Sequence, residues 1–269
     1  MKDLKAKIAV VTGASEGIGR AVAIRLAQAG ALVIPLARSQ DKLNEVVATI
    51  QAAGGQAEAF VCDLRDVEAT VKTLRAIESK YRAVDLLVNN VGAGTFKPLD
   101  RMSLDEAVLS VQLPVQAAIV ATHTVLPGML ARKRGHVVNI TSPSGYFPLP
   151  NMLPYTAARH AMNGFSLGLF EELRGVDGVT ATLVCPAQVN TGYFDRNDAD
   201  MGWYPRIAKI FPVLEADFVA ERVYRAIIKN KREVIFPFIL WFFIRHYQQL
   251  PKFTFWFLRV TGLMRPTNR

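Results

Sequence analysis

The stretch TGASEGIG, residues 12–19, contains three glycines at the spacing of a tight turn, Gly13, Gly17 and Gly19. It follows the apolar run Ile8–Val11 and opens a segment with a helical period. Such a turn lets the backbone approach a pyrophosphate, whose charge the first N–H groups of the helix can hold. The glycines alone fit an ordinary strand-to-helix turn equally well. Their place between strand and helix favours a dinucleotide loop, whose expected contacts also include Ser15, Glu16 and Ile18.

Outward from this loop, short apolar runs alternate with longer segments of helical period. The segment Ile18–Ala29, for example, has its apolar residues on one helical face. Seven runs indicate buried strands: Ile8–Val11, Leu32–Leu36, Ala57–Val61, Leu86–Val88, Val137–Ile140, Thr180–Val184 and Val234–Phe236. Seven strands alternating with six helices predict an α/β fold, a Rossmann-type doubly wound seven-stranded parallel sheet with helices on both faces. Ligands of such sheets bind beyond the carboxyl ends of the strands.

The chain of 269 residues, 51% of them hydrophobic, suits one large domain, and no linker rich in Pro, Gly or Ser divides it. We expect a cofactor-binding and catalytic domain over residues 1–236 and a C-terminal extension over residues 237–269. The net charge of +9 suits an acidic partner. Nucleic acid is not expected, because no recognised nucleic-acid-binding module accompanies the charge. We expect no metal site.

Two cysteines, Cys62 and Cys185, each end an apolar run, where buried strand residues lie. We expect both to be reduced thiols in the core, which favours a cytoplasmic protein. The first residues run directly into an apolar strand, without the hydrophobic region of a signal peptide.

Three motifs occur in order along the chain: TGASEGIG, then NNVG at residues 89–92, then Ser142 thirteen positions before the Tyr155 of YTAAR. Together they resemble the short-chain dehydrogenase/reductase family over roughly residues 5–236. The resemblance implies a nicotinamide-dependent oxidoreductase that forms homodimers or homotetramers through two long helices. It is much less specific for the substrate.

By this resemblance, several strand ends would contact the cofactor. Arg38, in LARSQDKL, offers charge-assisted donors to the 2′-phosphate of NADP, where a carboxylate would bind the 2′-hydroxyl of NAD. NADP(H) is therefore the expected cofactor, unless Arg38 only solvates a loop. Asp63 would contact the adenine, or act as the N-cap of the next helix, or both. Further expected contacts are Ser39, Leu64, Asn90, Val91, Gly92, Pro186, Val189 and Thr191.

The resemblance also implies the catalytic roles. Tyr155 would exchange a proton with the carbonyl or alcohol oxygen, and Ser142 would position that oxygen. Arg159 stands where the family has lysine. Arginine stays charged and favours a nearby phenolate, although its planar fork fits the cofactor ribose differently. We therefore expect Arg159 to keep the site active with an altered pH dependence. We also expect Arg159 and Tyr155 to contact the cofactor. The alternative is that the two are only neighbours on a helix surface.

A second departure from the family lies in LSVQLPVQAA, where the family has an asparagine that holds a water in a proton relay. The sequence aligns Gln112 with that asparagine, so a relay through this longer side chain is expected. The alternative is that Gln112 is polar surface near a bend at Pro114. In CPAQVNT, Ala187 stands where the family has a glycine. Alanine has fewer accessible backbone conformations than glycine, but this does not exclude cofactor binding.

Residues 192–215 occupy the place of the family's substrate lid, and long connections in compact domains are often lids. Aromatic side chains here predict an apolar pocket, which suits an extended hydrophobic ketone or alcohol better than a sugar. The expected lining is Tyr193, Phe194, Met201, Trp203, Tyr204 and Phe211, with Tyr146, Phe147 and Leu149 from SGYFPLP. Anchoring of the lid or a subunit contact is the alternative role of these aromatics.

The C-terminal extension interleaves aromatic with basic residues and contains no acid. Its apolar run is too short to span a bilayer, and Arg245 and His246 interrupt it. The pattern resembles an interfacial amphipathic element that docks a protein on a membrane. Covering the substrate cleft, or packing on another subunit, is an equal alternative.

Two functions follow. The first is an NADP(H)-dependent oxidoreductase that interconverts a hydrophobic ketone and a secondary alcohol, with Tyr155 as acid/base. The second is a cofactor-binding protein of the same fold, in which Arg159 and Gln112 have ended hydride transfer and left a sensing or scaffolding role. The intact Ser142, Tyr155 and glycine loop favour catalysis.

Overall fold

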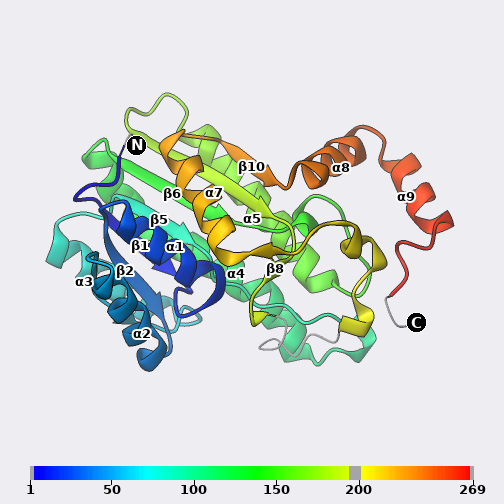
Figure 1. Cartoon of the computed structure of the whole chain (residues 1–269), viewed down its shortest axis with the longest axis horizontal. Coiled ribbons are helices and arrows are strands. Elements are labelled where there is room, and N and C mark those ends of the chain that lie inside the picture. The colour runs from blue at the N-terminus through cyan, green and yellow to red at the C-terminus, as the bar shows by residue number, and fades with distance from the viewer. Residues whose placement is uncertain (1–2, 194–200, 267–269) are drawn as a thin grey trace.

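A parallel sheet runs through the molecule in the order β10-β7-β6-β5-β1-β2-β3 (Figure 1). The computed structural model describes residues 3–193 and 201–266, without the side chain of Met201. The longer strands are β1 (Ile8–Thr12), β2 (Leu32–Ala37), β5 (Leu86–Asn89), β6 (Gly135–Ile140), β7 (Val179–Pro186) and β10 (Glu233–Phe236). The prediction of a seven-stranded Rossmann-type sheet is confirmed, with its third strand interrupted: β3 (Gln56–Ala57) and β4 (Phe60–Val61) each pair with β2.

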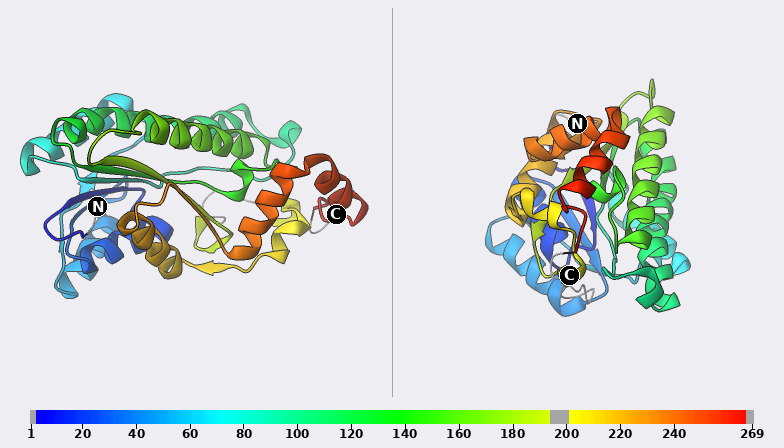
Figure 2. Two further views of the ribbon diagram at one scale, coloured as in Figure 1. Left: turned by 90° about the horizontal axis from the view of Figure 1, so that it is seen from above. Right: turned by 90° about the vertical axis from the view of Figure 1, so that its right-hand side faces the viewer.

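Helices cover both faces of the sheet (Figure 2). One layer contains α1 (Gly17–Gln28), α2 (Gln40–Ala52) and α7 (Ala216–Ile228). The other contains α3 (Val67–Tyr81), α4 (Leu104–Ala131) and α5 (Leu153–Glu172). By length and composition alone α4 could cross a membrane, but it packs against α3, α5 and strands β5 and β6, as a core helix does.

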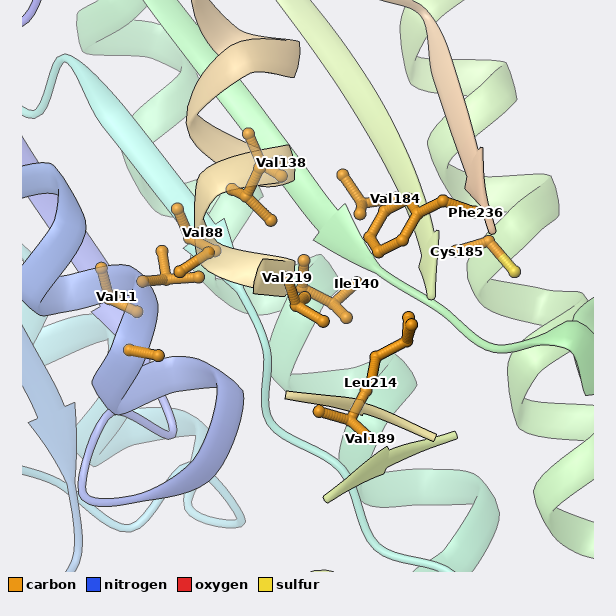
Figure 3. Packing of buried hydrophobic residues seen from close by; sticks show 14 of the residues in the cluster. Val11, Val88, Val138, Ile140, Val184, Cys185, Val189, Leu214, Val219 and Phe236 are labelled. Carbon is orange, nitrogen blue, oxygen red and sulfur yellow. The ribbon is translucent and has the colours of Figure 1, made fainter. Parts of the chain in front are cut away.

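Two hydrophobic clusters, one on each face of the sheet, form the core. Alternate residues of a strand point to opposite faces, so Val10 belongs to one cluster and Val11 to the other. Figure 3 shows the cluster that contains Val11, Val88 and Val138, with Val219 of α7 packed against the strands. Cys62 and Cys185 are buried free thiols in these clusters, so their expected burial is confirmed.

The strand order reverses between β1 and β5, because the chain builds outward from β1 to β3 and then crosses back to β5. Such a switch point opens a crevice at the carboxyl ends of the strands. Thr12 joins the two ends, since its Oγ1 donates to the Val88 carbonyl at 3.2 Å and accepts from the Asn90 N–H at 3.0 Å. The glycine loop after β1 and NNVG after β5 therefore lie side by side.

Beyond β10, two helices extend the molecule along its long axis (Figures 1 and 2): α8 (Phe238–Gln249) and α9 (Pro251–Val260). The short strands β8 (Val189–Asn190) and β9 (Leu214–Glu215) pair in parallel and bracket the connection in which a lid is expected. After α9 the chain returns to that connection, where the Ile207 N–H donates to the Leu263 carbonyl at 2.9 Å.

Candidate active site

A cavity of about 620 Å³ lies at the carboxyl ends of the strands. It collects the expected cofactor contacts from five separate segments of the chain: Gly13, Ser15, Glu16, Gly17, Ile18, Arg38, Ser39, Asp63, Leu64, Asn90, Val91, Gly92, Pro186, Val189 and Thr191. Ser142, Tyr155 and Arg159 line the same cavity. Gly19 and Gln112 are the two expected site residues that do not line it.

The glycine loop has the backbone that its sequence predicts. Gly13 and Gly17 have φ of +63° and +58°, a region that favours glycine. Gly19 lies below the loop, where an added Cβ would fall 2.2 Å from the Gly13 carbonyl oxygen. The Glu16 side chain does not cap α1, so it leaves the first N–H groups of the helix for another acceptor, and Gly17 and Ile18 of this first turn line the cavity. This cradle fits the pyrophosphate of a dinucleotide.

Asn90 holds the loop in this conformation. Its Nδ2 donates to the carbonyls of Thr12 at 3.3 Å and Gly13 at 3.2 Å. An added Cβ on Gly13 would lie 3.2 Å from that nitrogen. The side-chain amide of Asn90 therefore hydrogen-bonds to the loop backbone. Asn90 positions the loop as well as lining the cavity.

Cations gather where the second strand ends. Arg38 is exposed and makes no side-chain hydrogen bond or ion pair with the residues that the structure describes. Lys42 also lines the cavity and pairs with Glu16 at 3.3 Å. Sequence reasoning missed Lys42, although its position one turn after Ser39, the N-cap of α2, was a signal. Two cations here fit a phosphate better than a ribose hydroxyl.

Asp63 faces the same end of the cavity. It does not cap the next helix: Asp66 is the N-cap of α3 and accepts from the Ala69 N–H at 2.9 Å, so the N-cap alternative for Asp63 is wrong. The hydrogen bond from Arg65 to the Asp63 carboxylate, at 2.5 Å, holds the pKa of Asp63 below its ordinary value.

Tyr155 and Arg159 form a buried pair on α5. The guanidinium carbon of Arg159 lies 4.8 Å from the centre of the Tyr155 ring, and Nη1 donates to the Ile140 carbonyl at 3.2 Å. The interpretation of these residues as helix-surface neighbours is wrong, because both are buried. Glycine makes room for both: an added Cβ on Gly92 would lie 2.5 Å from Arg159 Nη2, and one on Gly94 would lie 2.5 Å from Tyr155 Cδ2.

The electrostatics of Arg159 suit a site that receives negative charge. Burial lowers the pKa of the guanidinium, but the phenol groups of Tyr155 and Tyr193 raise the pKa by more, so its net value lies above the ordinary one. Among the described residues no carboxylate pairs with Arg159, and its buried Nε has no hydrogen-bond partner. Because a buried unpaired charge is costly, this donor set fits a ligand or phenolate that supplies the balancing charge.

Ser142 reaches the cavity from the end of β6. Its Oγ accepts from the Ser144 N–H at 3.4 Å as a short 3₁₀ turn begins. Asn163 of α5 fixes this turn, since it accepts from Thr141 Oγ1 at 2.7 Å and donates to the Gly145 carbonyl at 2.8 Å. The turn is thereby tied to the helix that carries Tyr155, and Ser142 and Tyr155 line one cavity.

Gln112 lies outside the cavity, so the structure does not place it where the expected proton relay would run. The side chain is exposed, and its Nε2 donates to Gln116 Oε1 at 2.9 Å. The alternative interpretation, polar surface near Pro114, agrees with this placement. On α4 the residue that lines the cavity is the next one, Leu113, which is apolar and which the sequence reasoning did not single out.

The far end of the cavity is apolar and aromatic. Of the expected lining it contains Tyr193, Tyr204 and Phe211, with Phe147 and Leu149. Phe96, not expected from sequence, packs edge-on against Tyr155 at 5.3 Å between ring centres. Ala187 lines the cavity too, so alanine at this position does not close the cavity.

Two expected lining residues lie elsewhere. Tyr146 points away from the cavity, and its Oη donates to Glu233 at 2.7 Å. Trp203 does not line the cavity, and Arg101 lies 5.2 Å from its ring. Phe194 and the Met201 side chain are outside the described part of the structure.

Comparisons with known proteins agree with this site. A family model described as short chain dehydrogenase matches residues 7–202. The 17-beta-hydroxysteroid dehydrogenase 13 of Homo sapiens is 29% identical over 255 residues, which cover 93% of this chain and 81% of that protein. A metagenomic short-chain oxidoreductase in complex with NADP matches with a TM-score of 0.73 and 32% identity, covering 87% of this chain and 97% of that chain. A short chain dehydrogenase/reductase from Burkholderia phymatum in complex with NAD matches with a TM-score of 0.83 and 25% identity, covering 94% and 96%.

Proposed function

The chain belongs to the short-chain dehydrogenase family, and from this premise we propose that it is an NADP(H)-dependent oxidoreductase that interconverts a hydrophobic ketone and a secondary alcohol. One observation carries the proposal. Tyr155 and Ser142 line the cavity that contains the glycine loop, and the Arg159 guanidinium is buried against the Tyr155 ring. In a scaffold that only binds a cofactor, Arg159 would still have a role at the cofactor, but Ser142 and Tyr155 would have no substrate oxygen to position or protonate.

The bound cofactor supplies the hydride for reduction and accepts it in oxidation. During reduction, the Tyr155 hydroxyl gives its proton to the carbonyl oxygen, and in the reverse direction the phenolate takes the proton from the alcohol. The Ser142 hydroxyl donates a hydrogen bond to the same oxygen and fixes its position. Arg159 stabilises the phenolate that remains after proton transfer, because a fixed opposite charge favours the ionised form. Burial strengthens this stabilisation, since water does not screen it.

The preference for NADP(H) rests on Arg38 and Lys42. Both line the cavity, and Arg38 has no competing side-chain partner among the described residues. Related structures hold NADP in one case and NAD in another. Arg38 supports NADP(H) for this chain, because a 2′-phosphate would balance its charge, and Lys42 lies on the same part of the cavity wall as a second donor.

The substrate is proposed to be lipophilic. The cavity wall beyond Tyr155 consists largely of aromatic and aliphatic side chains, among them Phe96, Leu113 and Phe211. A polar polyol would leave its hydroxyl groups unpaired against this wall. A relative named for a hydroxysteroid supports the same class of substrate.

We further propose a homo-oligomer in the cytoplasm. On α4, six large apolar side chains lie exposed, as at a subunit contact: Leu104, Val108, Leu109, Val111, Ile119 and Leu130. The buried free thiols of Cys62 and Cys185 suit a reducing compartment.

The test follows NADPH oxidation with a panel of hydrophobic ketones, for the wild type and Tyr155→Phe side by side over a range of pH. We expect turnover by the wild type. The variant, which loses the proton donor with little change in shape, should lose turnover at least 100-fold yet bind NADPH nearly unchanged. Equal turnover of the two proteins would remove Tyr155 from the mechanism. Tight NADPH binding without wild-type turnover on any ketone would favour the sensing or scaffolding role.

A further inference from the structure

Exposed aromatic side chains concentrate on the last two helices. Among the described residues, six of the seven exposed Phe and Trp side chains lie on α8 and α9. We call these six the aromatic face: Phe238, Trp241, Phe242, Phe253, Trp256 and Phe257. Phe242 and Trp256 are 58% and 59% exposed, although their rings are among the largest apolar groups of the chain. An apolar patch of this kind marks a contact surface for a protein or a membrane.

The aromatic face is continuous across both helices. His246 joins them, with Phe242 at 6.4 Å and Phe253 at 6.1 Å between ring centres. Phe253 in turn lies 5.8 Å from Trp256. Both views of the molecule place α8 and α9 at one end of its long axis (Figures 1 and 2). The two helices that carry the aromatic face therefore lie at the end of the molecule, beyond the sheet.

The charges near the aromatic face distinguish between a second copy of the chain and a lipid surface as its partner. Lys252 and Arg259 are exposed on α9, and residues 237–266 contain no Asp or Glu. Arg245, on α8, is already paired with Glu233 of β10. In a symmetric contact with a second copy, the cations of α9 would approach each other without acids to balance them. An anionic lipid surface balances them, and Trp and Phe are favoured at its boundary.

We propose that the aromatic face docks this protein on an anionic membrane surface. The opposite side of α8 packs behind the wall of the cavity. Phe243 of α8 packs on Phe147 at 5.0 Å and on Phe211 at 5.8 Å between ring centres, and both of these line the cavity. The membrane would then lie one helix away from the apolar end of the cavity. One side of α8 thus supports two residues of the cavity wall, and the other side carries the exposed aromatic side chains.

Delivery of a lipophilic substrate from the membrane would rest on the proposed function, whereas binding to lipid does not. The experiment therefore measures co-sedimentation of the full chain with vesicles of pure phosphatidylcholine and with vesicles that contain phosphatidylglycerol. We expect at least tenfold stronger binding to the anionic vesicles. Phe242→Ser/Trp256→Ser and, separately, Lys252→Glu/Arg259→Glu should each lower that binding at least tenfold.

A matched control separates this surface from general attraction of a basic protein. Lys72→Glu/Arg75→Glu makes the same charge change on exposed residues of α3 and should lower binding less than threefold. Because the Lys252→Glu/Arg259→Glu variant changes only exposed side chains, it keeps the test meaningful if the aromatic variant does not fold. The proposal is overturned if the wild type binds neither vesicle or if control and α9 variants lose binding equally. Dissociation of a wild-type oligomer by Phe242→Ser/Trp256→Ser, without lipid binding, would instead make the face a subunit contact.

Discussion

The Arg159 guanidinium carbon lies 4.8 Å from the centre of the Tyr155 ring, and both side chains are buried in α5. This contact shows how Arg159 is placed relative to the phenol. The charge is fixed close to the phenol, and a backbone carbonyl, that of Ile140, holds it there. The site thus keeps its cation, and only the shape and donors of the cation differ.

Removal of this charge should therefore lower turnover strongly, and its replacement by another cation should lower turnover only slightly. Arg159→Met keeps an apolar side chain of moderate length but removes the cation, and we expect turnover to fall on the order of 100-fold. Arg159→Lys restores a cation at a different point, so turnover should stay within about tenfold while the pH profile shifts. Steady-state rates of both variants from pH 6 to pH 10 check this. A methionine variant as active as the wild type would exclude an electrostatic role.

Gly92→Ala tests the position of the charge without changing it. An added Cβ would lie 2.5 Å from Arg159 Nη2, so the guanidinium must shift from its place beside the phenol. We expect kcat to fall roughly tenfold or more, since a small misplacement at a reacting group is costly. The loss should largely disappear when Gly92→Ala is made in the Arg159→Met background, because nothing is then displaced. Equal losses in both backgrounds would place the effect elsewhere.

The residues of the site differ in how well their positions could be predicted from the sequence. The glycine loop, NNVG and Arg38 follow strands, and the ends of parallel strands meet at one edge, so their convergence was predictable. Gln112 lies on a helix, where one residue turns the side chain by about 100°, and Leu113 faces the cavity instead. Tyr146 follows a 3₁₀ turn that directs it to Glu233. Loop and helix directions of this kind depend on packing that a pattern does not contain.

Gln112→Ala should accordingly leave catalysis intact. The side chain is exposed and its amide contacts Gln116, so no group in the cavity loses a partner. We expect kcat and KM to remain within about twofold of the wild type, as is usual for surface substitutions. A drop of kcat by tenfold or more would mean that the side chain enters the site during turnover, and would restore the relay.

Cofactor choice should depend on Arg38. In Arg38→Glu a 2′-phosphate would lose a charge-assisted contact of about 1.5–3 kcal/mol, so NADPH affinity should fall on the order of 10- to 100-fold. NADH, which lacks that phosphate, should bind equally well or better. Fluorescence titration with both nucleotides measures this. Arg20→Glu is the matched control, because Arg20 is exposed, contacts Thr49 and lies outside the cavity. The assignment fails if Arg38→Glu weakens both nucleotides alike.

Stability should fall in mild acid because of His136. This residue of β6 is fully buried, and its Nε2 lies 2.7 Å from Thr182 Oγ1. Burial lowers the pKa of His136 from 6.5 to about 3, so the folded state keeps the ring neutral where the unfolded chain takes up a proton. The stability present above pH 6.5 is therefore lost progressively as the pH falls toward 3, with a slope of at most about 1.4 kcal/mol per pH unit.

His136→Gln isolates this contribution, since glutamine keeps a polar end near Thr182 but does not titrate. Between pH 7.5 and pH 5 the wild type should lose roughly 2 kcal/mol more of its free energy of unfolding than the variant does. Urea unfolding of both proteins at the two pH values measures this difference. The contributions of the other titrating groups are the same in both proteins and cancel when the two pH dependences are subtracted. The variant is expected to be less stable at pH 7.5 but to show the shallower pH dependence. Parallel losses in the two proteins would mean that His136 is protonated in the folded state, and that a group elsewhere governs unfolding in acid.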